Sequence, residues 1–271
     1  MLTETENVED PLRAMRRPGI VPLIGTPLAT ALAAVAAVTI LCWIWIVPMA
    51  RDMYGPMTGP SAWMMRPTWD VRYVALTFAM WSVMMAGMML PSAFPLLVLY
   101  AGRLRGDTGR ARAALQLVAL ATGYLLVWVA FSGAATALQR LLSGWFVLTP
   151  MLEMATPRAE AVVLLLAGAY QFTPLKRACL TACRSPLSFV MAVRGSGAPA
   201  ALRLGITHGI YCVGCCWALM LLLFAGGIMN LWVIVTLTTL VLVEKVLPFG
   251  EHTSRAIGVA LLGLGVWRLW S

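Results

Sequence analysis

Seven long apolar stretches, separated by short polar or glycine-rich segments, dominate the chain. A helix rises 1.5 Å per residue, so about 20 apolar residues are needed to cross the roughly 30 Å of hydrocarbon in a bilayer. The stretches lie at 28–50, 73–100, 113–138, 159–175, 204–225, 229–248 and 256–270. Because open sheet edges cannot face lipid, this pattern predicts an all-α, polytopic transmembrane helical bundle with about seven spans.

Proline and glycine positions predict where these helices bend or stop. Pro91 and Pro95 should kink the second helix, since proline removes a backbone hydrogen bond and clashes with the preceding turn. Gly226 and Gly227 should form a tight turn between the fifth and sixth stretches. The fourth stretch is short, and losing its crossing would invert every span that follows.

Composition and charge agree with a membrane protein. The chain is 61% hydrophobic and 11% charged, whereas soluble domains average about 25% charged residues. Arg13, Arg16 and Arg17 precede the first stretch, which predicts a cytoplasmic N-terminus, and seven spans then place fourteen of the twenty Lys and Arg residues on that side. We therefore expect a cytoplasmic segment at 1–27 and a single transmembrane domain at 28–271. In a membrane protein, the net charge of +9 is interpreted by the side of the bilayer on which each charged residue lies, so the lipid bilayer is the expected partner and nucleic acid is not.

Clustered cysteines are the strongest chemical signal. Five of the six fall in two groups, which are Cys179 and Cys183, and Cys212, Cys215 and Cys216. The predicted topology places both groups near the cytoplasmic face, where thiols are normally kept reduced, so metal ligation or redox chemistry is favoured over structural disulfides. His208 lies one helical turn before Cys212 and shares a face with that group. The remaining alternative is that small cysteines simply pack between helices.

The ligand types favour a soft metal ion. Thiolates and an imidazole at this spacing suit Cu(I) or Zn(II), and thioethers shift the preference toward Cu(I). The second stretch supplies thioethers on two adjacent lines of one helix, at Met80, Met84, Met85, Met88 and Met89. Neutral sulfur ligands can hold a cation in an apolar path without burying a carboxylate. Core packing is the alternative role for these methionines.

Two adjacent charged residues lie near the inner end of the sixth stretch. Neighbouring helical residues do not face each other, so Glu244 and Lys245 are not expected to pair. Lys245 is expected to extend to the membrane interface. Glu244 either balances a bound cation or proton inside the bundle or lies at the interface.

Four motifs in this order resemble a known family. They are Met80-Trp81 through Met89 with Pro91-Ser92, Tyr170 through Lys176 with Cys179, Cys183 and Arg184, His208 through Trp217, and Glu244-Lys245. Together they resemble a bacterial family of predicted metal-binding integral membrane proteins that includes the tyrosinase-associated membrane copper chaperone. The resemblance spans about residues 75–250. It implies copper handling in the bacterial inner membrane, in support of a copper-enzyme client or in exchange with a soluble copper carrier, with the cysteines, His208 and the methionines as ligands.

The leading hypothesis is therefore a membrane copper chaperone or relay that is not an enzyme. One alternative is a membrane thiol-disulfide oxidoreductase that uses Cys212 and Cys215 as a Cys-x-x-Cys pair. Another is a small-solute permease with Glu244 as a proton site. A retinal protein is excluded because the last span has no lysine for a Schiff base. Nucleotide hydrolysis is excluded because the chain has no glycine-rich phosphate loop followed by Lys and Ser or Thr.

Overall fold

Helices account for the regular structure in the computed structural model, which describes residues 26–55, 57–59, 61–65, 68–104, 109–149, 151–192, 195–247 and 249–271. The α-helices are α1 (Thr26–Met53), α2 (Val71–Met89), α3 (Phe94–Arg103), α4 (Arg110–Gly144), α5 (Pro157–Tyr170), α6 (Pro174–Cys183), α7 (Pro186–Ala192), α8 (Gly197–Gly226), α9 (Leu231–Val246) and α10 (Gly250–Trp270). Short 3-10 helices η2 (Ala62–Met65) and η3 (Leu90–Ala93) complete the set. The all-helical prediction is confirmed. Of the predicted N-terminal segment 1–27, residues 1–25 lie outside the described ranges.

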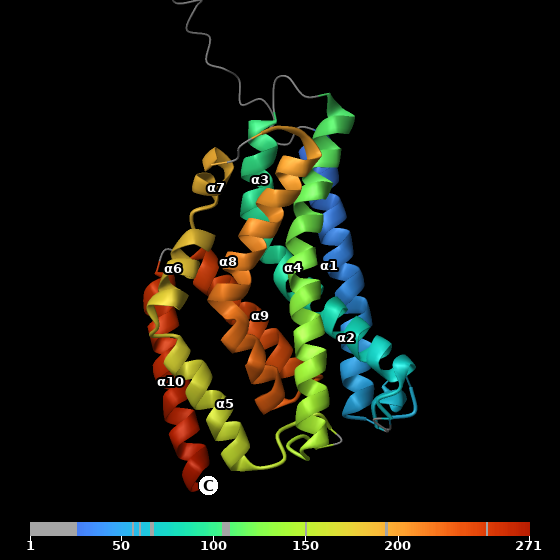
Figure 1. Ribbon diagram of the computed structural model, residues 1–271, viewed down its shortest axis with the longest axis vertical. Coiled ribbons are helices and arrows are strands. Elements are labelled where there is room, and N and C mark those ends of the chain that lie inside the picture. The colour runs from blue at the N-terminus through green and yellow to red at the C-terminus, as the bar shows by residue number, and fades with distance from the viewer. Residues whose placement is uncertain are drawn as a thin grey trace, which may run out of the picture.

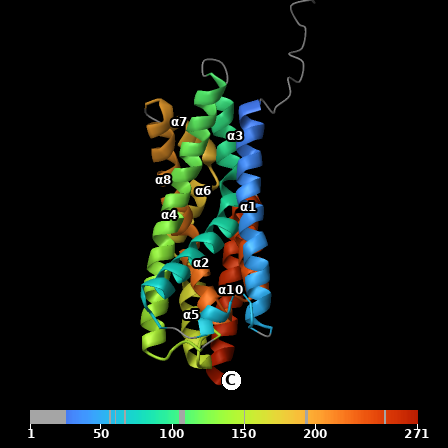
Figure 2. The ribbon, with the colours of Figure 1, turned by 90° about the vertical axis from the view of Figure 1, so that its right-hand side faces the viewer.

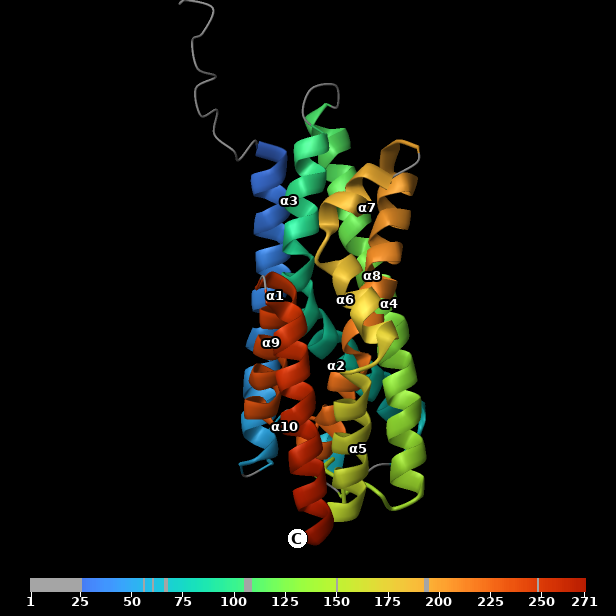
Figure 3. The same ribbon diagram turned by 90° about the vertical axis from the view of Figure 1, so that its left-hand side faces the viewer.

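The helices form one elongated bundle. Helices α1, α4 and α8 run along most of its length, and α2 continues through η3 into α3 to do the same (Figures 1 and 2). Helices α5, α9 and α10 occupy the half of the bundle that contains the C-terminus, whereas α7 lies beside α3 in the other half (Figure 3). The start of α1 and the end of α10 therefore lie at opposite ends of the bundle.

Four helical segments are long and apolar enough to cross a membrane. Among the described residues they are Ala29–Met53, Val71–Arg103, Arg110–Gly144 and Gly197–Gly226. These correspond to the first, second, third and fifth predicted stretches. The sixth stretch forms the 16-residue α9 and the seventh the 21-residue α10.

Proline positions interrupt two of the predicted helices. The kink expected at Pro91 is present, because α2 ends at Met89 and η3 spans Leu90–Ala93 before α3 begins. The expectation of one helix across 159–175 is wrong, because α5 ends at Tyr170. Helix α6 begins at Pro174, where Thr173 caps it by accepting a hydrogen bond from the Lys176 amide at 3.2 Å. Because of this second break, α6, which contains Cys179 and Cys183, packs against α8.

Glycines bring α4 and α8 into direct backbone contact. A Cβ atom on Gly205 would lie 2.0 Å from the Leu120 carbonyl oxygen, and one on Gly123 would lie 2.2 Å from the Leu202 carbonyl oxygen. Close approach of this kind is how small residues allow membrane helices to pack. At the other end of α8, Gly227 adopts a φ of +94°, which confirms the tight turn predicted at Gly226 and Gly227.

Candidate metal centre

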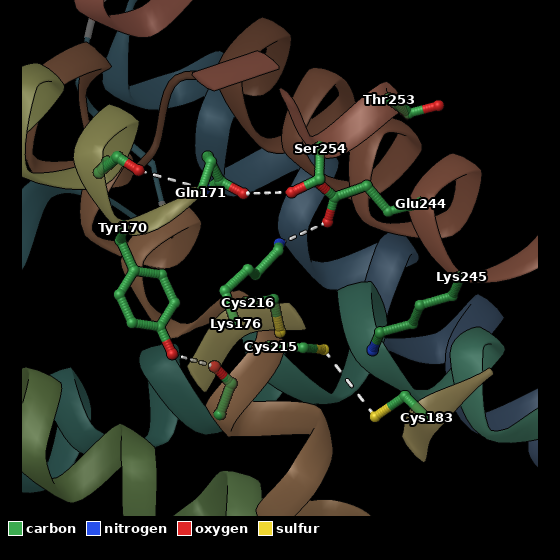
Figure 4. A network of polar contacts seen from close by, with 12 residues as sticks. Tyr170, Gln171, Lys176, Cys183, Cys215, Cys216, Glu244, Lys245, Thr253 and Ser254 are labelled. Carbon is green, nitrogen blue, oxygen red and sulfur yellow. Dashed lines mark hydrogen bonds and ion pairs between the residues drawn. The ribbon is translucent and has the colours of Figure 1, made fainter. Parts of the chain in front are cut away.

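The two cysteine groups meet in the interior of the bundle. Cys183, at the end of α6, lies with its Sγ 3.9 Å from the Sγ of Cys215, in the middle of α8 (Figure 4). Both side chains are buried and both thiols are free. Because α6 lies about half-way along the bundle, the sulfurs are deeper than the end position expected from the sequence (Figure 1).

The other members of the two groups surround this sulfur pair. Cys179 packs against the α8 backbone, since a Cβ atom on Gly214 would lie 2.7 Å from the Cys179 Sγ. Cys216 follows Cys215 on α8 and donates to the Cys212 carbonyl oxygen at 2.8 Å. We call Cys179, Cys183, Cys212, Cys215 and Cys216 the thiol cluster.

Cys212 has a different environment, because polar side chains from three other elements contact its sulfur. The Lys245 ammonium donates to the Cys212 Sγ at 2.7 Å, and the Tyr124 hydroxyl lies 2.9 Å from the same atom. Lys245 also donates to the Ser92 hydroxyl at 3.1 Å, and Ser92 lies 3.0 Å from Tyr124. Helices α4, α8 and α9 and the η3 segment therefore meet around one thiol.

His208 lies beside the thiol cluster, and its ring is next to that of Tyr124. Its side chain is 3% exposed, and its ring centroid is 5.8 Å from that of Tyr124 and 5.4 Å from that of Phe189. Its Nδ1 has no hydrogen-bond partner. A buried imidazole nitrogen without a partner is available to bind a proton or an ion.

The predicted methionine ladder is buried, and the backbone at its end is bound by hydroxyls that lie beside the Cys212 sulfur. Its five members, Met80, Met84, Met85, Met88 and Met89, are each 0% exposed. At its end, the Met89 carbonyl oxygen accepts hydrogen bonds from Ser92 at 2.8 Å and from Tyr124 at 2.9 Å. The two hydroxyls that hold the end of α2 are thus the ones that lie near the Cys212 sulfur.

The charged residues of α9 point to different partners. Glu244 forms a buried ion pair with Lys176 of α6, with 2.7 Å between Oε2 and Nζ (Figure 4). Glu244 and Lys245 do not pair with each other, as predicted. The expectation that Lys245 extends to the interface is wrong, because its side chain reaches toward the sulfurs, where a thiol and a hydroxyl accept its protons.

The closest approach between the two cysteine groups is the sulfur pair of Cys183 and Cys215. In the described part of the chain, no group of three or more His, Cys, Asp or Glu side chains is arranged to hold one metal ion. Two metal–sulfur bonds of about 2.3 Å can span the separation between Cys183 and Cys215. The donor set therefore fits a soft ion bound by two thiolates, and it lacks the four assembled ligands of a structural zinc site.

Comparison with known families decides the class of protein. A family described as "PpoB2: Copper chaperone" matches residues 78–268, which include the methionine ladder, the thiol cluster and the charged residues of α9. The chain belongs to the PpoB2 copper chaperone family. No curated protein and no solved structure matches the chain. Membership in the PpoB2 family agrees with the resemblance noted in the sequence, and a copper chaperone carries an ion without catalysing a reaction.

Sequence reasoning missed Tyr124 and the pairing of Lys176, and it predicted the wrong direction for Lys245 in this PpoB2 family member. Tyr124 gives no motif signal, since a tyrosine inside an apolar helix is ordinary. Lys176 and Lys245 are the only lysines in the chain. Their position next to apolar stretches was the available signal, because a charge buried at such a place must be paired.

Proposed function

We propose that the protein is a membrane copper chaperone that holds Cu(I) at the thiol cluster and exchanges it along the methionine ladder. Copper is the cargo, and the protein spans the bacterial inner membrane seven times with its N-terminus in the cytoplasm. A copper enzyme or a soluble copper carrier is the expected client. The observation that carries the proposal is the 3.9 Å contact between the sulfurs of Cys183 and Cys215, on two helices far apart in sequence.

Ligand chemistry supports Cu(I) as the ion. Thiolates and thioethers are soft ligands that select Cu(I). Every candidate sulfur is buried, so copper bound there is shielded from water. Cys183 and Cys215 form the primary site, and Cys179, Cys212, Cys216 and His208 can join as copper enters or leaves.

Proximity of the end of α2 to Cys212 supports the exchange step. Ser92 and Tyr124 hydrogen-bond the end of α2 and also lie near Cys212. Neutral thioethers bind copper more weakly than thiolates do, so an ion can pass between the two kinds of site without a chemical reaction. The direction of copper transfer depends on which client removes copper from the protein or supplies copper to it.

Copper content of purified protein tests the proposal. Wild-type protein in detergent, loaded anaerobically with Cu(I) and desalted, should retain about one copper per chain by elemental mass spectrometry. Cys183→Ser and Cys215→Ser should each lose most of it. The matched control is Cys42→Ser, because Cys42 is also buried but lies on α1, outside the thiol cluster.

Redox state separates this proposal from the thiol-disulfide alternative. Alkylation of intact cells should find the thiols of the cluster reduced. A fraction of disulfide that responds to an added thiol-disulfide partner, together with no retained copper, would favour the oxidoreductase and overturn the proposal.

A further inference from the structure

An apolar groove opens on the half of the bundle that contains the C-terminus. It lies between α5, α8, α9 and α10 and has a volume of about 450 Å³. Its walls include the face of α9 from Val233 to Leu240 and the face of α10 from Ile257 to Leu264. At 1.5 Å per residue, the groove therefore follows these helices for about 10 Å. Among the described residues that line it, Glu160 is the only charged one.

The size of the groove decides between a helix and a flexible chain as its occupant. A helix is 10–12 Å across with its side chains, so a length of about 10 Å fills roughly 800–1,100 Å³. The groove offers about half of that volume. It therefore fits a narrow apolar chain, such as the acyl chain of a lipid, and is too small for a helix of a second copy.

Tryptophans mark the end of the groove where Glu160 lies. Trp232, in the first turn of α9, lines the groove, and Trp267 and Trp270 lie in the last turn of α10. All three side chains are exposed. Helix α5 begins and α10 ends at this end of the bundle (Figure 3). Because tryptophan is enriched where a bilayer meets water, this end of the groove lies at the level of the lipid headgroups.

An ion pair with unused hydrogen-bonding groups stands at the same end. The Arg268 Nε lies 3.2 Å from the Glu160 Oε1, and both side chains are partly exposed. Across the described ranges, the Glu160 Oε2 and the two Nη groups of Arg268 have no hydrogen-bond partner. Arg158 is two residues before Glu160, so it does not share the same face of α5, and it does not line the groove. The groove thus ends at one negative and one positive group that can each bind a further partner.

We propose that this groove binds one phospholipid with a zwitterionic headgroup of the phosphatidylethanolamine type. One acyl chain lies along α9 and α10. The Nη groups of Arg268 donate to the lipid phosphate, and the lipid ammonium donates to the free oxygen of Glu160. An anionic lipid supplies only the phosphate, which would lie beside the Glu160 carboxylate without a compensating ammonium. This inference rests on the proposed membrane placement of the chain and not on the copper site.

Native mass spectrometry of the full-length protein in mild detergent tests this site. The protein is mixed with equal amounts of phosphatidylethanolamine and phosphatidylglycerol that carry the same acyl chains. Wild type should retain one phosphatidylethanolamine, with a preference of about fivefold over phosphatidylglycerol, which is the effect of one partly exposed ion pair. Equal retention of the two lipids would overturn the inference.

Filling the groove should remove the lipid. Ala260→Phe places an aromatic ring in the groove, and Val259→Phe is the matched control, because Val259 is the preceding residue of α10 and is exposed outside the groove. We expect retention of phosphatidylethanolamine to fall about tenfold in Ala260→Phe, since the acyl chain loses its apolar contacts. It should stay at the wild-type level in Val259→Phe. Equal retention in the two variants, or a complex of two chains that only Ala260→Phe dissociates, would overturn the inference.

A charge substitution tests the headgroup separately. Glu160→Gln removes the partner of the lipid ammonium, and Glu251→Gln removes a carboxylate of α10 that does not line the groove. The preference for phosphatidylethanolamine should be lost in Glu160→Gln and kept in Glu251→Gln, and the opposite result would refute the headgroup assignment. Copper content is measured in the same samples. Bound copper without retained lipid would overturn this inference alone, whereas retained lipid without copper would overturn the proposed copper site alone.

Discussion

Lys176 and Glu244 form an ion pair in which both side chains are only 1% exposed, with 2.7 Å between nitrogen and oxygen. The pair joins α6, which carries Cys179 and Cys183, to α9, which carries Lys245. The second carboxylate oxygen of Glu244 is buried without a partner. The ion pair therefore links the helix that carries two of the five cysteines of the thiol cluster to α9, at the cost of burying two charges.

Removing one partner of this pair should destabilise the protein strongly. Glu244→Gln leaves Lys176 as an uncompensated buried charge, which costs about 3–5 kcal/mol. The double variant Lys176→Met with Glu244→Met replaces both charges by apolar groups and should recover much of that loss. Thermal unfolding in detergent measures both. Equal midpoints for Glu244→Gln and wild type would show that the pair does not hold α6 to α9.

Shortening the methionine ladder should slow copper exchange and leave the fold intact. Met84→Leu and Met88→Leu conserve volume, so each should cost less than about 1.5 kcal/mol of stability. Leucine has no sulfur to bind copper. We therefore expect the double variant to transfer Cu(I) across the membrane of proteoliposomes about tenfold more slowly than wild type. The amount of copper bound at the thiols should not change.

The matched control for the ladder is Met220→Leu on α8, which is also 0% exposed but lies outside the ladder. This variant should transfer copper at the wild-type rate. Equal rates in the ladder variant and the control would assign the methionines of α2 to core packing alone.

The direct contact between α4 and α8 leads to a second prediction, which concerns the unfolding temperature. Gly205→Ala would place a methyl group 2.0 Å from a backbone oxygen of α4, so the two helices must move apart and the unfolding temperature should fall. Gly133→Ala is the control, because the nearest atom to its Cβ is a side-chain carbon of Phe78 at 3.8 Å. Alanine is favoured over glycine inside a helix by about 1 kcal/mol, so this control should match or exceed wild type. If Gly205→Ala proved as stable as Gly133→Ala, the close contact would be refuted.

Much of the helical architecture could be predicted from the sequence. Apolar length and the positions of Pro91, Gly226 and Gly227 were sufficient to predict helices, a kink and a turn, because these effects act locally along the chain. The break between Tyr170 and Pro174 was missed, because the predicted apolar stretch at 159–175 includes the two polar residues within the break, Gln171 and Thr173. Only the N-cap at Thr173 followed by proline indicates that a new helix starts there.

The centre was less predictable because it depends on contacts between helices. Helical spacing predicted that the cysteines of α8 lie together, but it could not show that Cys183 approaches Cys215 across 32 residues. The direction of Lys245 was predicted wrongly, since a lysine near a helix end usually extends to the interface. Its inward direction follows from the thiol and hydroxyl that α8 and η3 place within its reach.

The central claim is that Cu(I) is bound by the sulfurs of Cys183 and Cys215. X-ray absorption at the copper edge of anaerobically loaded protein tests it most directly, with Cys183→Ser measured beside the wild type. We predict a monovalent copper ion with about two sulfur neighbours in the wild type and the loss of that signal in Cys183→Ser. A first shell of nitrogen and oxygen, or an identical sulfur shell in both proteins, would contradict it.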